Sequence, residues 1–314
     1  MSGPPRVAVA GEAAGATVLG LTTRQLGLAM AFGGMLLIST DSLITRAAEV
    51  NGWVVTFWYG VFICPTMLLY LLILERGRPV RAVRRSGKWV LVSAVLQTIS
   101  TTAFIMAVKN TTISNVVIIV ASVPLLTALL AWALLGERAS RRLWFSIMAS
   151  VVGVLIVVWG SLDLGGLSGN LLALTAVVAF AFNLTIWRRF PGISRVLVIA
   201  ISAFMGALLA VTQTDVGGQT ARTYLLMLLM GTVFGPTGRI AVSSSTRYIT
   251  AAEVSLMTPV ETVAASLWAW LAFAEQPPPA SFVGGAIVLA AVAYGTILPA
   301  LRRSPAGLRT SPSG

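Results

Sequence analysis

Residues 112–135 read TISNVVIIVASVPLLTALLAWALL, a run of 24 residues without a charged side chain. A helix needs about 20 apolar residues to cross a bilayer core about 30 Å thick. This stretch is long enough, and charged residues return at Glu137 and Arg138, immediately beyond it. It therefore predicts a transmembrane helix.

The composition of the whole chain agrees with this interpretation. Of its 314 residues, 57% belong to the set AVILMFWYC and only 10% are charged, and the mean hydropathy is +0.89. Soluble domains carry about 45–50% apolar and about 25% charged residues. The composition therefore excludes a soluble globular protein and predicts an all-α integral membrane protein.

Similar apolar segments recur along the chain, separated by short polar or arginine-rich breaks. We expect ten, with nine as the alternative count, because the seventh is short and the eighth is the least apolar. The expected segments are residues 25–45, 53–74, 88–108, 112–135, 142–161, 168–187, 194–212, 223–246, 251–274 and 280–299.

The ends of the chain are polar. Residues 1–24 lack the compact apolar run and cleavage site of a secretory signal peptide, so we expect an N-terminal cytoplasmic segment. Residues 302–314 are rich in Pro, Ser and Arg and predict a disordered cytoplasmic tail. Between them, residues 25–161 and 168–299 would form two units of five helices each.

The net charge of +12 comes from 22 Lys and Arg residues against 10 Asp and Glu residues. With ten helices, 18 of the 22 cations lie on the side of the two termini and three on the opposite side, and Arg239 falls within a helix. The positive-inside rule then places both termini in the cytoplasm and the protein in the cytoplasmic (inner) membrane. The basic balance is an orientation signal and indicates no nucleic-acid partner.

The composition also disfavours enzymes. The chain has no histidine and a single cysteine, Cys64, and it lacks the glycine-rich loops that hold nucleotide phosphates. Histidine bases, Cys/His nucleophiles and internal disulfides are therefore absent. We expect neither catalysis nor a cofactor.

An internal repeat relates the two units. Equivalent residues lie 138 positions apart, in the pairs Lys109 and Arg247, Trp132 and Trp270, and Glu137 and Glu275. Because five is an odd number, the second copy would enter the membrane from the opposite side. Inverted repeats of this kind recur in secondary transporters.

The repeated segments carry short motifs: PLL at 124–126 and LGE at 135–137 in the first copy, and YITAAEVSL at 248–256, LWAWL at 267–271 and EQP at 275–277 in the second. On these, nearly the whole chain resembles the EamA-like family of the drug/metabolite transporter superfamily. The second copy departs from the family pattern with Thr262 in place of proline and Ala274 in place of glycine, and Pro259 stands three residues earlier. The resemblance implies an inner-membrane carrier with two five-helix repeats, a central cavity and alternating access.

Ionisable residues inside membrane helices are expensive and indicate a functional site or a paired structural contact. If the eighth and ninth helices form a hairpin that turns near residue 250, Arg239 lies level with Glu261, and Arg247 lies level with Glu253. The sequence therefore predicts two ion pairs between these helices. The alternatives are that the pairs only hold adjacent helices together, or that Arg239 binds a carboxylate of the substrate while Glu261 orients it or carries a proton.

Other polar residues are candidates for the same cavity. Asp41 matches Asn183 at an offset of 142, and Gln97 and Thr101 belong to a polar face of the third helix, whereas Trp268 could line a pocket. Packing between helices is the alternative for each. Hinges are expected at Pro124, Pro236 and Pro259.

Together these features predict a secondary-active transporter that exports a small organic metabolite, such as an amino acid, with a proton as a candidate coupling ion. Arg239 suits a carboxylate. The alternative is a flippase for a lipid or a lipid-linked sugar, which would need a lateral opening and a larger polar groove.

Overall fold

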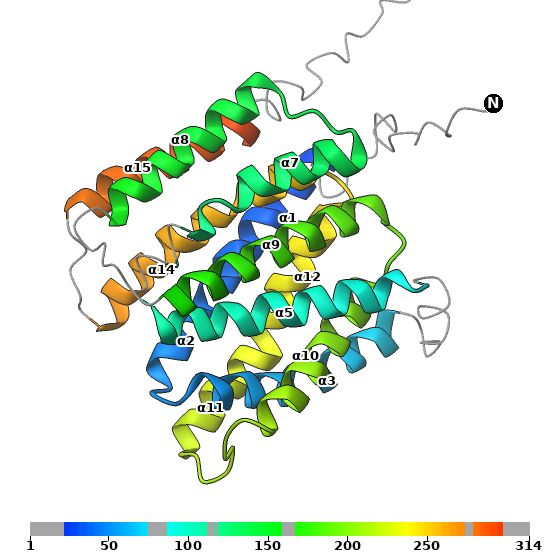
Figure 1. The fold of residues 1–314 in the computed structure, drawn as a ribbon, viewed down its shortest axis with the longest axis vertical. Helices are drawn as coiled ribbons and strands as arrows, with labels where there is room; N and C mark the ends of the chain where they lie inside the picture. Colours follow the sequence, from blue (N-terminus) through cyan, green and yellow to red (C-terminus); the bar gives the residue numbers. More distant parts are fainter. Residues whose placement is uncertain are drawn as a thin grey trace, which may run out of the picture.

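The computed structural model describes residues 22–74, 87–111, 116, 119–158, 167–273 and 279–297. Within these residues every regular element is helical (Figure 1). Residues 1–21 of the expected N-terminal segment 1–24, the expected tail 302–314 and Glu275 lie outside the described residues. The elements are α1 (Thr23–Ile38), α2 (Thr40–Ala47), α3 (Gly52–Leu74), α5 (Trp89–Asn110), α7 (Val123–Leu135), α8 (Arg141–Val158), α9 (Leu167–Arg189), α10 (Arg195–Val211), α11 (Ala221–Leu229), the π-helix η1 (Met230–Phe234), α12 (Gly235–Ser245), α13 (Ala251–Ser255), α14 (Thr258–Phe273), α15 (Pro279–Val292) and the π-helix η2 (Ala293–Ile297).

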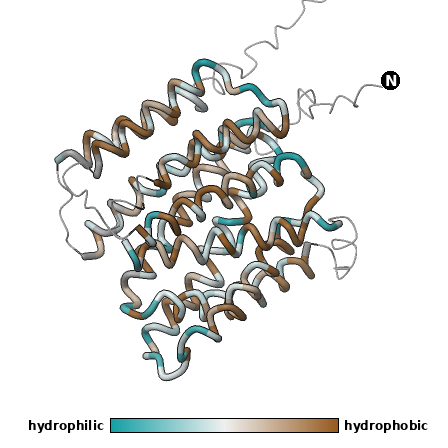
Figure 2. The backbone as a smooth tube through the Cα atoms, viewed as in Figure 1, coloured by the Kyte–Doolittle hydropathy of each residue, from teal (hydrophilic) through white to brown (hydrophobic). Residues whose placement is uncertain are grey.

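The helices are apolar over most of their length, and polar residues gather towards their ends (Figure 2). Large apolar side chains such as Leu69, Phe145 and Leu271 are exposed, which is typical of a surface that faces lipid. Five stretches of the described residues are long and apolar enough to cross a membrane: Thr23–Thr45, Gly52–Ile73, Trp89–Val108, Leu167–Arg189 and Ala221–Ser245. Three further apolar helices are shorter in the described residues, namely Val123–Leu135, Arg195–Val211 and Phe282–Thr296, so the count of ten stays a prediction.

The long helices pack in pairs. α1 lies against α12, α3 against α10, α5 against α9, and α8 against α15. In Figure 1 the α8–α15 pair lies at one edge of the bundle and the α3–α10 pair towards the opposite edge. Each pair joins one helix from the first half of the chain to one from the second, so the core lies between the halves.

Small residues allow these pairs to approach closely. A Cβ atom on Gly34 of α1 would lie 2.9 Å from the carbonyl oxygen of Gly238 in α12, and one on Gly60 of α3 would lie 2.6 Å from that of Ala203 in α10. Larger side chains would force the helices apart. Close backbone contact of this kind is how membrane helices associate without a hydrophobic driving force.

Candidate functional site

The first membrane segment is broken rather than straight. The Ser39 hydroxyl donates to the Leu36 carbonyl at 2.6 Å, and the Thr40 hydroxyl donates to the Leu37 carbonyl at 2.7 Å. These local bonds compete with the helical ladder, and α1 ends at Ile38 while α2 begins at Thr40. The break places Asp41 in the first turn of α2.

Trp268 supports this break from α14. Its indole N–H donates to the Ser39 hydroxyl at 2.8 Å. The same side chain borders an open groove of about 630 Å³ that is lined almost entirely by apolar residues of α1, with Phe234 and Ala241 opposite. Trp268 is therefore beside the break in the first segment and lines this apolar groove.

Arg239 lies on α12, directly after the π-helix η1. The Gly235 N–H bonds to the Met230 carbonyl, and Pro236 occupies the first turn of α12. Single π-turns inside α-helices often occur at functional sites. The helical path continues through Gly235 and Pro236 by way of the π-turn.

The partner of Arg239 differs from the one expected. Its Nη1 atom lies 2.8 Å from Oδ2 of Asp41, and the two side chains are 17% and 13% exposed. Its guanidinium lies over the ring of Tyr59, 5.0 Å from the ring centroid. The predicted Arg239–Glu261 ion pair is therefore wrong as a direct contact, although Glu261 interacts electrostatically with both Asp41 and Arg239.

Helix packing explains this difference. The prediction assumed that the eighth and ninth membrane segments pack as a hairpin, but α12 packs against α1, and α14 packs against α1, α2 and α15. A turn at Leu256 and Met257 also separates α13 from α14, which changes the face that Glu261 presents. The carboxylate nearest to Arg239 comes from the opposite end of the sequence.

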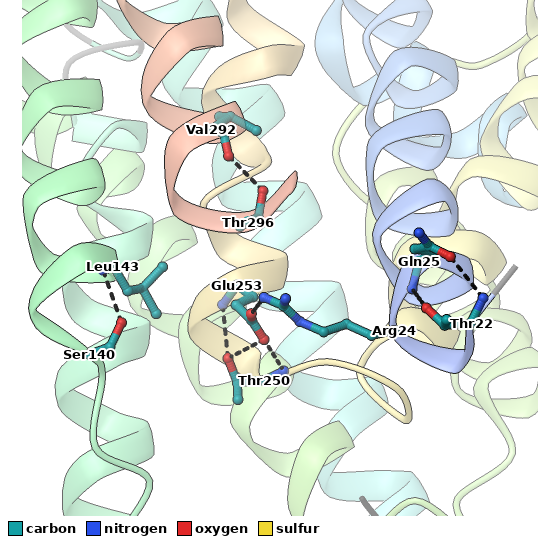
Figure 3. Close-up of polar contacts among 9 residues, drawn as sticks. All are labelled: Thr22, Arg24, Gln25, Ser140, Leu143, Thr250, Glu253, Val292 and Thr296. Carbon is teal, nitrogen blue, oxygen red and sulfur yellow. Dashed lines mark hydrogen bonds and ion pairs between the residues drawn. The ribbon is translucent and has the colours of Figure 1, made fainter. Parts of the chain in front are cut away.

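The second predicted pair is wrong as well. Arg247 is exposed, and Glu253 pairs with Arg24 at the start of α1 (Figure 3). The Glu253 carboxylate also accepts from the backbone N–H and the hydroxyl of Thr250, which forms the capping box of α13. Glu253 therefore caps one short helix and ties it to α1.

Two more arginines make contacts at the end of the bundle where Arg24 pairs with Glu253. Arg188 at the end of α9 pairs with Glu137 at 2.7 Å and donates to the Thr246 carbonyl. Arg195, 2% exposed, donates to several backbone carbonyls, including those of Ile193 and Trp187 at 2.6 Å each. We refer to Arg24, Glu253, Arg188, Glu137 and Arg195 as the arginine end cluster.

A chain of hydrogen bonds joins α5 to α9. Asn183, which is fully buried, accepts from the Ser93 hydroxyl and donates to the Gln97 side-chain oxygen at 2.9 Å. Gln97 in turn donates to the Thr101 hydroxyl at 3.1 Å. The bonds of Asn183 join two helices, as its packing alternative describes, while Gln97 and Thr101 also reach towards the centre of the bundle.

That centre is a small polar cavity of about 20 Å³. It lies between α3, α5, α10 and α12, which come from both halves of the chain. Its lining includes Thr56, Tyr59, Gln97, Thr101, Ser202 and Arg239. Three of the expected site residues, Gln97, Thr101 and Arg239, therefore meet at one place.

The three hinge prolines occupy equivalent local positions. Pro124, Pro236 and Pro259 each lie in the first turn of a helix, namely α7, α12 and α14. Proline fits there because the first-turn N–H has no helical partner to lose. Pro124 and Pro259 therefore follow an irregular turn, whereas Pro236 follows the π-helix η1 inside the continuous helical stretch Ala221–Ser245.

Tyr59 is a site residue that the sequence indicated only as one of several aromatic residues deep in the membrane that could line a pocket. Its contact with Arg239 depends on which helices face it. The same holds for Arg24, because nothing near it in the sequence points to Glu253.

These features define a multi-pass helical membrane protein with a polar centre between two halves. The sequence profile of the EamA-like transporter family matches residues 25–159 and 167–296. The chain belongs to this family, in two repeats, and members of the family are transporters.

Named relatives and a solved structure agree with this assignment. The chain is similar to the pseudopaline exporter CntI of Pseudomonas aeruginosa strains UCBPP-PA14 and PAO1, with 23% identity over 230 residues, 72% of this chain and 80% of each relative. A solved crystal structure shares the fold at a TM-score of 0.77 and 17% identity, covering 88% of this chain and 98% of its own.

Proposed function

We propose that the protein is a secondary-active transporter that exports a small organic metabolite, such as an amino acid, by alternating access. The observation that carries this proposal is the Arg239 guanidinium at a polar cavity between the two halves. Arginine binds carboxylates through two parallel hydrogen bonds. Charged groups in membrane segments are otherwise rare.

We further propose ten spans arranged as two inverted five-helix repeats. A two-fold axis that exchanges the repeats would convert the contact between segments three and six, α5 with α9, into the contact between segments eight and one, α12 with α1. Both contacts are present. The α3–α10 and α8–α15 pairs would map onto themselves, and both are present as well.

The polar contacts support the same symmetry. Asp41 bonds to Arg239, whereas its counterpart Asn183 bonds to Gln97, which bonds to Thr101, the counterpart of Arg239. One half therefore carries an ion pair where the other carries neutral amide and hydroxyl groups. This asymmetry assigns the charged part of the site to α2 and α12.

The size of the cavity supports alternating access. About 20 Å³ holds a single water molecule, so a solute must bind in a wider conformation. The arginine end cluster would close one end of the bundle between transport steps. We place this end and both termini in the cytoplasm, in accord with the positive-inside rule.

A proton is the proposed coupling ion. Two carboxylates, Asp41 and Glu261, interact electrostatically with one arginine, Arg239. Burying a second unbalanced negative charge is expensive, so one of the two carboxyl groups would hold a proton while Arg239 alone balances them. Transport driven by an imposed pH gradient in vesicles tests this coupling.

A flippase is the second candidate, because the groove beside Trp268 is open. Its lining offers almost no polar atoms for a sugar or a lipid headgroup, which favours the solute carrier. Translocation of fluorescent lipids in vesicles, with no uptake of amino acids, would reverse this preference.

The test is uptake of each amino acid into proteoliposomes. We expect transport of at least one, its loss in Arg239→Gln, and partial retention in Arg239→Lys, which keeps the charge but not the bidentate geometry. Arg222→Gln is the matched control because Arg222 is exposed. Proteoliposomes inert to all amino acids, or a folded Arg239→Gln protein with normal transport, would refute the proposal.

A further inference from the structure

Tyr59 has a buried hydroxyl that meets no partner in the part of the chain that the structure describes. The side chain is 5% exposed, and its Oη atom has no hydrogen-bond partner among those residues. It lines the same small cavity as Arg239. Buried polar atoms in native proteins are nearly always hydrogen-bonded, so a buried atom without a partner needs an explanation.

The backbone of α12 is shaped to admit this hydroxyl. A Cβ atom on Gly235 would lie 2.7 Å from Oη of Tyr59 and 2.9 Å from a ring carbon. Only glycine at 235 therefore leaves room for the ring in this position. Gly235 and Arg239 are four residues apart, so the hydroxyl and the guanidinium approach one face of the helix about one turn apart.

The guanidinium of Arg239 also has unused capacity. Its ion pair with Asp41 uses one nitrogen and one carboxylate oxygen, and Oδ1 of Asp41 has no hydrogen-bond partner within the described ranges. A bidentate pair would have used both oxygens. Asp41 thus neutralises Arg239 without occupying its whole hydrogen-bonding fork.

We propose that Tyr59 is a substrate-binding residue that determines specificity: its hydroxyl donates a hydrogen bond to a carboxylate group that Arg239 holds in the central cavity. This rests on the proposed function and deepens it, because it names the substrate class as solutes with a carboxylate rather than a neutral polar group. The hydroxyl donates to a charged acceptor, which makes a stronger bond than a neutral pair. The phenol ring, stacked on Arg239, fixes the direction of the donor.

The test uses a pair of probes that differ only at this group. Propionate and propionamide are added to purified protein, and protection against heat unfolding gives the affinity of each. We expect wild-type protein to prefer propionate, and Tyr59→Phe to weaken propionate binding about tenfold or more while leaving propionamide unchanged. Tyr59→Phe keeps the ring and its stacking on Arg239, so a purely structural role of the ring does not predict this selective loss.

Two glycine variants provide a matched pair. Gly235→Ala should displace the Tyr59 ring and reproduce the loss of preference for propionate. Gly33→Ala is the control, because a Cβ atom at Gly33 meets no atom within 4 Å. Equal preference for the two probes in wild-type protein, or an unchanged preference in Tyr59→Phe, as expected if the hydroxyl only holds a water molecule, overturns the proposal.

Failure of the proposed function gives a different result. If no amino acid is transported but propionate binds in a manner that depends on Tyr59, the carboxylate site stands and the amino-acid proposal fails. If an amino acid and its amide lose affinity equally in Tyr59→Phe, the transport function stands and the role of the hydroxyl fails.

Discussion

Removing Arg239 should be far more harmful to stability than removing its partner Asp41. Arg239→Gln leaves Asp41 and Glu261 in a mostly buried site without a cation. Breaking a buried ion pair from one side costs about 3–5 kcal/mol. The side chains of Arg239 and Asp41 are still 17% and 13% exposed to solvent. We therefore expect the free energy of unfolding to fall by an amount at the lower end of this range, about 3 kcal/mol.

Asp41→Asn has a different consequence. Arg239 loses one carboxylate but still interacts electrostatically with Glu261, which can approach it as the replacement partner. The new amide still accepts a hydrogen bond, so we expect a loss of about 1 kcal/mol. The two substitutions should then differ by about 2 kcal/mol, more than tenfold in the unfolding equilibrium.

Equilibrium unfolding of the purified protein, followed by tryptophan fluorescence, measures both values. The double variant Asp41→Asn, Glu261→Gln removes both carboxylates and should be more destabilised than the sum of the two single variants, because each single variant keeps one partner for Arg239. Equal losses for Arg239→Gln and Asp41→Asn, or simple additivity in the double variant, would refute the idea that one arginine serves two carboxylates.

Three other predictions concern the structure around the site. Arg195→Ala should lower the free energy of unfolding by at least about 2 kcal/mol, because it leaves buried backbone carbonyls unpaired. Arg189 is exposed, so Arg189→Ala is the control and should leave the free energy of unfolding unchanged in the same assay. Asn183→Leu should cost about 1–2 kcal/mol by breaking the α5–α9 hydrogen-bond chain, and an unchanged unfolding midpoint would contradict this. Glu253→Gln should weaken the ion pair with Arg24 that ties α13 to α1. A cysteine placed in the central cavity should then react faster with a thiol reagent added on the side of the arginine end cluster. Unchanged labelling would show that this ion pair does not close the bundle.

The class of fold could be predicted because membrane helices are specified by local composition. A run such as residues 53–74 must form its backbone hydrogen bonds within the segment when it enters lipid, and it forms the single helix α3. The two repeats were also visible, because the residue pairs that mark them recur at a constant spacing.

The residues of the site could be predicted in part for a related reason. Arg239, Asp41, Glu261 and Glu253 are conspicuous as charges within apolar segments, and Gln97 and Thr101 as a polar face on an apolar helix. Their partners could not be predicted. The two expected ion pairs assumed that helices adjacent in the sequence pack together. Instead α1 packs against α12, and the first membrane segment supplies both partners: Asp41 of α2 pairs with Arg239, and Arg24 of α1 pairs with Glu253.

The sequence by itself determined that this protein lies in the membrane, that it has two related halves, and that Asp41, Arg239, Glu253 and Glu261 are charges within apolar segments. Each of these follows from the composition of single segments or from their repetition. Only the tertiary structure decided that Asp41 neutralises Arg239, that Asn183 bonds to Gln97 of α5, and that Tyr59 reaches the central cavity through the space left by Gly235. Those contacts join residues far apart in the chain, and they depend on which helix faces which, a choice made by the close packing of small residues along whole helices.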